Sequence, residues 1–164
     1  MTDTHKTRVA LLRAELKKRK LTGFFVPRAD EFQGEYVPAY AERLRWLTNF
    51  RGSAGIAIVT LKKAAIFVDG RYTLQVRDQV DGRWFDYKSV PQDSLADWLA
   101  DNVPVGAEVG FDPWLHTSGW AKSVAARLDK AGAKLVPVDG NPIDAVWADC
   151  PEPSPAPAFL QDEA

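Results

Sequence analysis

Apolar side chains follow helical spacing in some stretches of the chain and strand-like runs in others. Residues 6–20 carry an apolar stripe opposite a basic face, and residues 24–26 form a short apolar run closed by a proline. Residues 28–40 are polar and irregular, with Pro38 breaking any helix, and residues 41–48 return to helical spacing. Because a long polar loop directly after a strand often carries binding groups, we expect such groups in this loop.

The middle of the chain predicts a β-hairpin. Small residues at positions 52–55 precede an apolar, β-branched run at residues 56–61, and a second apolar run covers residues 64–68. Lys62 and Lys63 separate the two runs, and they lack the Asn-Gly chemistry of the tightest hairpins. We therefore expect an antiparallel pair of strands joined by a slightly longer turn.

Asp69 follows the second run and is expected to cap a helix that carries Tyr72, Val76 and Val80 on one face. The end of a strand is also a position at which α/β sheets often place functional groups. Arg71 lies in the same first turn, where a cation opposes the helix dipole. This placement favours an anionic partner, and a local ion pair with Asp69 or Asp86 explains it equally well.

The second half of the chain alternates again between the two patterns. Strands are predicted at residues 84–90, near the edge of the sheet, and at residues 108–112 and 134–138. Asp93 is the expected cap of one helix, Thr117 or Ser118 the cap of the next, and Gly132 lies just past its end.

A last helix is predicted to begin at Asn141. Pro142 occupies its first turn and Asp144 the capping-box position, with Val146 and Trp147 expected to be buried. Alternating strands and helices predict an α/β layered domain, and the hairpin makes its sheet mixed, with helices flanking it.

The composition changes abruptly after Asp149. Prolines at positions 151, 153, 155 and 157 alternate with small or charged residues, which favours an extended linker. We therefore predict a domain over residues 1–149 and a linker over residues 150–164 that leads to a further domain of a longer polypeptide.

Charge and cysteine content narrow the class of protein. The formal net charge of −1 predicts neither a nucleic-acid partner nor an anionic membrane surface. No run approaches the ~20 apolar residues of a membrane span, and polar residues occupy the amino terminus where a signal peptide needs an apolar core. A single cysteine suits a reducing compartment. We expect a soluble cytoplasmic protein.

Candidate metal and nucleophile chemistry is sparse in this chain. Neither His5 nor His116 has a second His or Cys at the spacing of metal ligands. Cys150 has no neighbouring base. The small residues at 52–55 precede a strand and lack the Lys-Ser/Thr of a phosphate loop. No catalytic residue, metal ligand or cofactor of its own is predicted.

Three stretches taken together form a recognisable pattern: ERLRWLTNF at residues 42–50, GSAG at 52–55 and FVDGRY at 67–72. They closely resemble the N-terminal domain of Xaa-Pro aminopeptidases (aminopeptidase P), within the creatinase/prolidase group. Residues 30–38 resemble the Glu-Tyr loop of that family, and Val146-Trp147 followed by prolines resembles its domain end. The resemblance covers residues 6–151, although Arg51 stands where Thr or Asp is more typical.

The resemblance implies a fold of the creatinase N-terminal, ribonuclease-H-like type. It also implies an enzyme that hydrolyses the bond between an N-terminal residue and a following proline. In that family two divalent metal ions, usually manganese, are held by a separate catalytic domain. The N-terminal domain of such enzymes is a wall of the cleft and contributes to contacts between domains and subunits of a homodimer. The residues expected to face the missing domains or the peptide are Arg28, Glu35, Tyr36, Arg43, Asp69, Arg71 and Tyr72.

Two alternatives stay open at this point. The chain could be a stand-alone binding or assembly module. It could also be a hydrolase of ribonuclease-H-like fold that gathers Asp69, Asp86 and Asp112 around metal ions.

Overall fold

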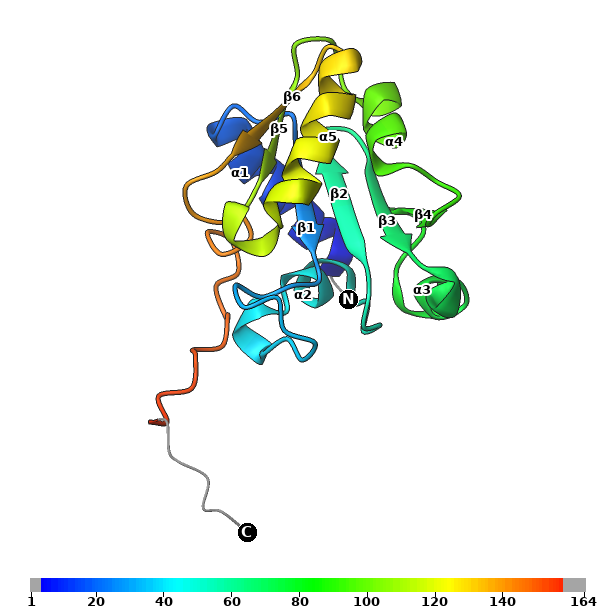
Figure 1. Ribbon diagram of the computed structural model, residues 1–164. Coiled ribbons are helices and arrows are strands. Elements are labelled where there is room, and N and C mark those ends of the chain that lie inside the picture. Colours follow the sequence, from blue (N-terminus) through cyan, green and yellow to red (C-terminus); the bar gives the residue numbers. More distant parts are fainter. Residues whose placement is uncertain (1–3, 158–164) are drawn as a thin grey trace.

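The computed structural model describes residues 4–157, in which a six-stranded sheet lies between two layers of helices (Figure 1). The strand order is β4-β3-β2-β1-β5-β6. The strands are β1 Gly23–Pro27, β2 Ile56–Thr60, β3 Ala64–Val68, β4 Asp86–Ser89, β5 Glu108–Phe111 and β6 Lys134–Pro137. All six strands predicted from the apolar runs are present, and β4 lies at the edge of the sheet as expected.

The sheet is mixed, as the hairpin required. Strand β2 pairs antiparallel with both β1 and β3, placing Phe25 opposite Ile58 and Ile58 opposite Ala65. The β3–β4, β1–β5 and β5–β6 pairs are parallel. All strands other than β2 therefore point the same way. Their C-terminal ends lie at the same end of the sheet as the beginning of β2, and we call this end the C-terminal edge.

Helices cover both faces of the sheet (Figure 1). On one face lie α1 Thr4–Lys18, α2 Arg43–Thr48 and α3 Gln75–Gln79, and on the other α4 Leu95–Asn102 and α5 Ser118–Lys130. Three 3-10 turns, η1 Ala39–Ala41, η2 Gly70–Tyr72 and η3 Pro113–Leu115, lie in connecting segments. None of the helices described is long and apolar enough to cross a membrane.

The pleat of β1 sends alternate side chains into two separate cores. Phe24 packs with Leu12 and Leu16 of α1, whereas Phe25 packs with Leu99 of α4 and Leu128 of α5. All six side chains are fully buried. A central strand buried on both faces explains why its sequence is continuously apolar.

Three predicted helix starts are wrong in detail. Asp69 caps the short turn η2, and α3 begins separately at Gln75, so Tyr72 and Val76 do not share one helix. Asp93 does not cap α4, because Ser94 accepts the N–H of Asp97, while the Asp93 carboxylate accepts the N–H of Ser89 instead.

The predicted helix at Asn141 is also wrong. Residues 142–146 form consecutive turns, and the side-chain oxygen of Asn141 accepts the N–H of Ile143 at 2.9 Å. Trp147 is buried as predicted, and Val146 is only half-buried. Residues 152–157 are exposed and carry no helix or strand, while residues 158–164 of the predicted linker lie outside the described residues. The domain boundary at residue 149 stays a prediction.

Candidate functional site

The C-terminal edge of the parallel strands brings together the loops that follow β1, β3 and β5. Chain connections leave β1 toward β2 on one side and leave β5 toward β6 on the other, so the topology reverses between β1 and β5. In open α/β sheets, ligands bind in the crevice outside the strand ends at such a reversal. The loop of residues 28–40 and the departing C-terminal segment lie at this end of the molecule (Figure 1).

Arg28 joins the loop after β1 to the segment that precedes β2. Its Nη1 donates to the main-chain oxygens of Glu35 and Ser53, both at 3.1 Å. The Ser53 hydroxyl in turn lies 2.5 Å from the hydroxyl of Tyr72, where the two share a hydrogen bond. Loops from three parts of the chain are therefore held in one arrangement by a short series of polar contacts.

An aromatic contact stabilises the same corner. The rings of Phe50 and Tyr72 meet edge to face, with centroids 5.7 Å apart. Gly52 lies beside them, and a Cβ at this position would come within 2.8 Å of Cδ1 of Tyr72. The absence of a side chain at Gly52 is therefore what allows the two rings to meet.

Asp69 and Arg71 pair with each other. Asp69 Oδ1 accepts the backbone N–H of Arg71 at 2.9 Å, and Asp69 Oδ2 accepts from Nη2 of Arg71 at 2.7 Å. These hydrogen bonds lower the pKa of the Asp69 carboxyl. The Arg71 guanidinium also lies 5.1 Å from the ring centre of Tyr72. Of the explanations open for Arg71, the structure shows the local pair with Asp69.

A pocket of about 390 Å³ opens at this edge, on the side of the sheet covered by α4 and α5. Arg28, Gln33 and Asp69 lie on its polar side. Its aromatic wall is formed by His116 and Trp120, whose rings stack with centroids 4.0 Å apart.

His116 is largely buried. Its Nδ1 lies 2.9 Å from the main-chain oxygen of Asp112, and its Nε2 is buried without a partner among the described residues. Burial lowers the pKa of His116, so the ring is neutral at pH 7.

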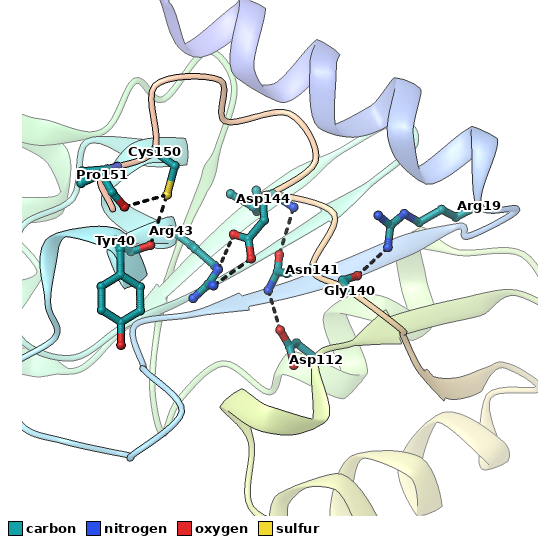
Figure 2. A network of polar contacts seen from close by, with 10 residues as sticks. Arg19, Tyr40, Arg43, Asp112, Gly140, Asn141, Asp144, Cys150 and Pro151 are labelled. Carbon is teal, nitrogen blue, oxygen red and sulfur yellow. Dashed lines mark hydrogen bonds and ion pairs between the residues drawn. The ribbon is translucent and has the colours of Figure 1, made fainter. Parts of the chain in front are cut away.

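Arg43 takes part in a different set of contacts, which holds the last part of the domain (Figure 2). Its Nε and Nη2 donate to the two carboxylate oxygens of Asp144 at 2.7 and 2.8 Å. Burial disfavours the charge of Arg43, but the hydrogen bonds and charge of Asp144 outweigh this effect and raise its pKa. This ion pair joins distant parts of the chain, because Asp144 lies 101 residues after Arg43.

Three further contacts continue this set along residues 139–151, which we call the C-terminal strap, and Figure 2 shows the first two of them. Asn141 Nδ2 donates to the buried carboxylate of Asp112 at 2.9 Å. Arg19 donates to the main-chain oxygen of Gly140 at 2.5 Å. Trp147 stacks on Trp46 with centroids 5.6 Å apart. The strap therefore belongs to the folded body as far as Cys150, whose thiol donates to the main-chain oxygen of Tyr40.

The predicted site residues thus fall into separate groups. Arg28, Asp69, Arg71 and Tyr72 lie together at the C-terminal edge. Glu35 takes part through its main-chain oxygen, which accepts from Arg28. Tyr36 projects from the loop and is 87% exposed. Arg43 lies in a different group, where it pairs with Asp144 of the strap.

Sequence reasoning missed the pocket wall of His116 and Trp120. The only signal for this wall in the sequence was His116, four residues after Asp112 at a strand end. That signal does not reveal which strands are neighbours in the sheet.

The three carboxylates of the hydrolase alternative do not converge. Asp69 and Asp112 follow the C-terminal ends of β3 and β5, whereas Asp86 begins β4. Because β3 and β4 are parallel and Asp86 lies opposite Ala65, Asp86 is at the other edge of the sheet. Within residues 4–157, no group of three His, Cys, Asp or Glu side chains could hold a metal ion. This geometry contradicts the hydrolase alternative.

Comparison with known proteins places the chain among related domains. A family model described as the creatinase/prolidase N-terminal domain matches residues 8–146. Xaa-Pro aminopeptidase 2 of Homo sapiens is 36% identical over 93% of this chain and 23% of its own length. A probable Xaa-Pro aminopeptidase P of Metarhizium robertsii is 39% identical over 94% of this chain and 26% of its own length. The chain thus spans about a quarter of these relatives.

Solved structures agree with the fold. The X-prolyl aminopeptidase of Caenorhabditis elegans, a cytosolic enzyme with a di-nuclear active site, matches with a TM-score of 0.83 and 29% identity, over 91% of this chain and 26% of that one. The N-terminal domain of the cytoplasmic peptidase PepQ from Mycobacterium tuberculosis matches over 85% of this chain and 98% of that one, with a TM-score of 0.64 and 20% identity.

Proposed function

Because the chain belongs to the creatinase/prolidase N-terminal domain family, we propose that it is the non-catalytic N-terminal domain of a metal-dependent Xaa-Pro aminopeptidase. The parent enzyme removes the N-terminal residue that precedes proline. Within it, this domain forms a wall of the cleft and a contact surface for other domains and subunits.

One observation carries this proposal: the carboxylates near the C-terminal edge are engaged in contacts that fix the loops. Asp69 is paired with Arg71, and Asp112 accepts from Asn141 and from the N–H of Trp114. The buried Asp30 accepts two backbone N–H groups of its own loop. Carboxylates that hold loops in place suit a rigid contact surface more than a reaction centre.

The family implies two divalent metal ions, manganese. The described residues do not provide a site for them, because they form no cluster of three ligating side chains. We assign the metals to the part of the parent polypeptide beyond this chain. The chain matches only about a quarter of the length of these relatives, which supports further domains in the same polypeptide. A homodimer and a cytoplasmic location complete the proposal, and the cytosolic relative from Caenorhabditis elegans supports the location.

Metal analysis and a peptidase assay test the assignment. The 164-residue chain should bind no stoichiometric manganese and should not cleave a peptide with proline at the second position. The parent polypeptide should do both. One tightly bound metal per chain, together with turnover by the chain alone, would refute the assignment.

A variant of the loop tests the contact surface. Tyr36→Ala removes a side chain that is 87% exposed, so the stability of the isolated chain should change by no more than about 0.5 kcal/mol. In the parent enzyme the same change should lower kcat/KM or weaken subunit association. Val105→Ala is the matched control, since Val105 is 86% exposed and precedes β5 at the opposite edge. Equal behaviour of the two variants in the parent enzyme would contradict a contact role for this loop.

A further inference from the structure

The pocket at the C-terminal edge has the location and the size of a small-ligand site. It is lined by residues that follow β1 and β5, the strands between which the topology reverses. Its volume of about 390 Å³ lies within the range of roughly 300–1,000 Å³ that is usual for small-molecule pockets.

Most of the pocket lining is apolar. Phe67 and Leu95 face it from β3 and α4, and Leu115 and Trp120 from the segment after β5. The Trp120 ring is held in place by an edge-to-face contact with Phe25 at 5.0 Å and by the stacked His116. This wall offers a preformed surface to an apolar side chain.

The polar end of the pocket carries a cation without an acidic partner. Arg28 is half-buried, and no carboxylate of residues 4–157 forms an ion pair with it. Among the residues that the structure describes, only the main-chain oxygens of Glu35 and Ser53 accept from this guanidinium; both bind its Nη1 and fix it in position. Nη2 and Nε therefore keep donors for a ligand.

The other ionisable groups in the pocket do not cancel this charge. Both oxygens of Asp69 accept hydrogen bonds from Arg71, so the carboxylate is already neutralised. His116 is neutral at pH 7 because burial lowers its pKa. A guanidinium beside an apolar wall recognises a carboxylate joined to an apolar group, and guanidinium–carboxylate hydrogen bonds are among the stronger ones in proteins.

We propose that this pocket binds a small carboxylate that carries an apolar side chain, with the carboxylate on Arg28 and the side chain against Trp120. Such a group occurs at the C-terminus of a peptide and in a free amino acid or acylamino acid. The inference goes beyond the proposed peptidase role, and binding to this chain does not depend on it.

The experiment titrates the 15N-labelled 164-residue chain with N-acetyl-L-leucine and, separately, with the uncharged N-acetyl-L-leucinamide. The acid should give saturable shifts of the Trp120 indole N–H and of the backbone N–H groups around Arg28, at concentrations up to about 10 mM. The amide should bind about tenfold more weakly or worse, because it lacks the charge that Arg28 recognises.

Two variants separate binding from folding. Arg28→Gln should weaken binding of the acid by about tenfold, whereas Arg45→Gln, at an exposed arginine of α2 outside the pocket, should leave it unchanged. Because Arg28 also holds two loop carbonyls, Ala54→Leu provides an independent test: it fills the pocket and leaves Arg28 in place.

The source of the carboxylate is distinguished by comparing N-acetyl-L-leucine with the tripeptide Ala-Ala-Leu. Tighter binding of the tripeptide assigns a peptide C-terminus, and equal binding assigns a free acid. Absence of saturable shifts at Trp120, equal affinity for acid and amide, or unchanged binding in Ala54→Leu would each overturn the proposal. None of these results bears on peptidase activity of the parent enzyme, so the two proposals fail separately.

Discussion

Gly52 shows how much of the candidate site depends on one small residue. A side chain at this position would displace the Phe50 and Tyr72 rings, and Tyr72 holds the hydroxyl of Ser53. A methyl group there must move at least one ring, and overpacking of this kind costs typically about 1–3 kcal/mol.

We therefore expect Gly52→Ala to lower the free energy of unfolding by about 1–3 kcal/mol, measured by urea denaturation. Gly119→Ala is the matched control, because Gly119 lies in the first turn of α5 and a Cβ added there would have open space around it. It should be neutral or stabilising by up to about 1 kcal/mol, since alanine reduces the entropy of the unfolded chain. Similar losses in both variants would contradict the steric explanation.

The pair of Asp69 and Arg71 makes a prediction about pH. The hydrogen bonds from Arg71 lower the folded-state pKa of Asp69 below its ordinary value of 3.8. The stabilisation from this pair is thus fully present above pH 3.8 and is lost as the pH falls through the lower folded-state value.

Arg71→Gln should raise the pKa of Asp69 toward 3.8, as measured by NMR titration of its carboxyl carbon. The Asp69 N-cap bond to the backbone N–H of residue 71 persists in this variant, so η2 should remain folded. An unchanged Asp69 pKa in Arg71→Gln would show that the pair is absent in solution.

At the scale of elements, the C-terminal strap depends on contacts between distant segments. The side chain of Arg43 is 12% exposed and its Nη1 is already without a partner among the described residues, so the guanidinium depends on Asp144. Asp144 itself is 42% exposed, which moderates the cost of losing the pair because solvent can reach the site.

Asp144→Ala should therefore destabilise the chain by about 1–2 kcal/mol in urea or thermal unfolding. Asp149→Ala provides the control: it removes an equal charge from an exposed position of the same segment and should change stability by less than about 0.5 kcal/mol. If both variants lost the same stability, net charge would be responsible instead of the ion pair with Arg43.

Strands were more predictable than helix starts, for a physical reason. An apolar run such as residues 64–68 has few alternatives to a buried strand. Asp93 and Asn141 were both predicted to begin helices, yet each side chain bonds to a backbone N–H in a turn or beside a strand end. Because Asp and Asn stabilise turns and caps by the same hydrogen bond, the residue type alone does not distinguish the two.

At the scale of the whole molecule, the strap decides where the folded body ends. Residues 152–157 are exposed, whereas Ile143 is fully buried and Trp147 is 8% exposed. A chain that ends at Pro151 should keep its stability within about 0.5 kcal/mol. A chain that ends at Gly140 should lose more than about 3 kcal/mol of stability, because removing Ile143 and Trp147 leaves a cavity where two large apolar side chains were packed.

Circular dichroism melts of the two truncated chains measure this difference. A large loss in the longer chain would show that residues 152–164 pack on the body, contrary to a linker. Equal stability of the two truncated chains would show that the strap contributes little.

The candidate site was only partly accessible to sequence reasoning. The motif around Asp69 and Tyr72 indicated a corner of the sheet, and the structure joins that corner to Arg28 through Ser53. The pocket wall at Trp120 was missed, because it depends on β5 lying beside β1. That parallel pair joins segments more than eighty residues apart, and no local pattern encodes which strands become neighbours.

The position of β1 in the sheet has a consequence for how the protein is made. On the ribosome its partner β2 emerges soon afterwards, but β5 and the strap come much later: Arg19, just before β1, binds Gly140, 121 residues further on. Val109 of β5 lies 86 residues after its partner Gly23 of β1, so at about 5–20 residues per second the interval before β5 is made lasts roughly 4–17 s. Throughout it, the nascent chain presents one open edge of an apolar strand, which is a template for pairing with other chains. The central strand of the sheet is thus among the first to be synthesised and among the last to be enclosed.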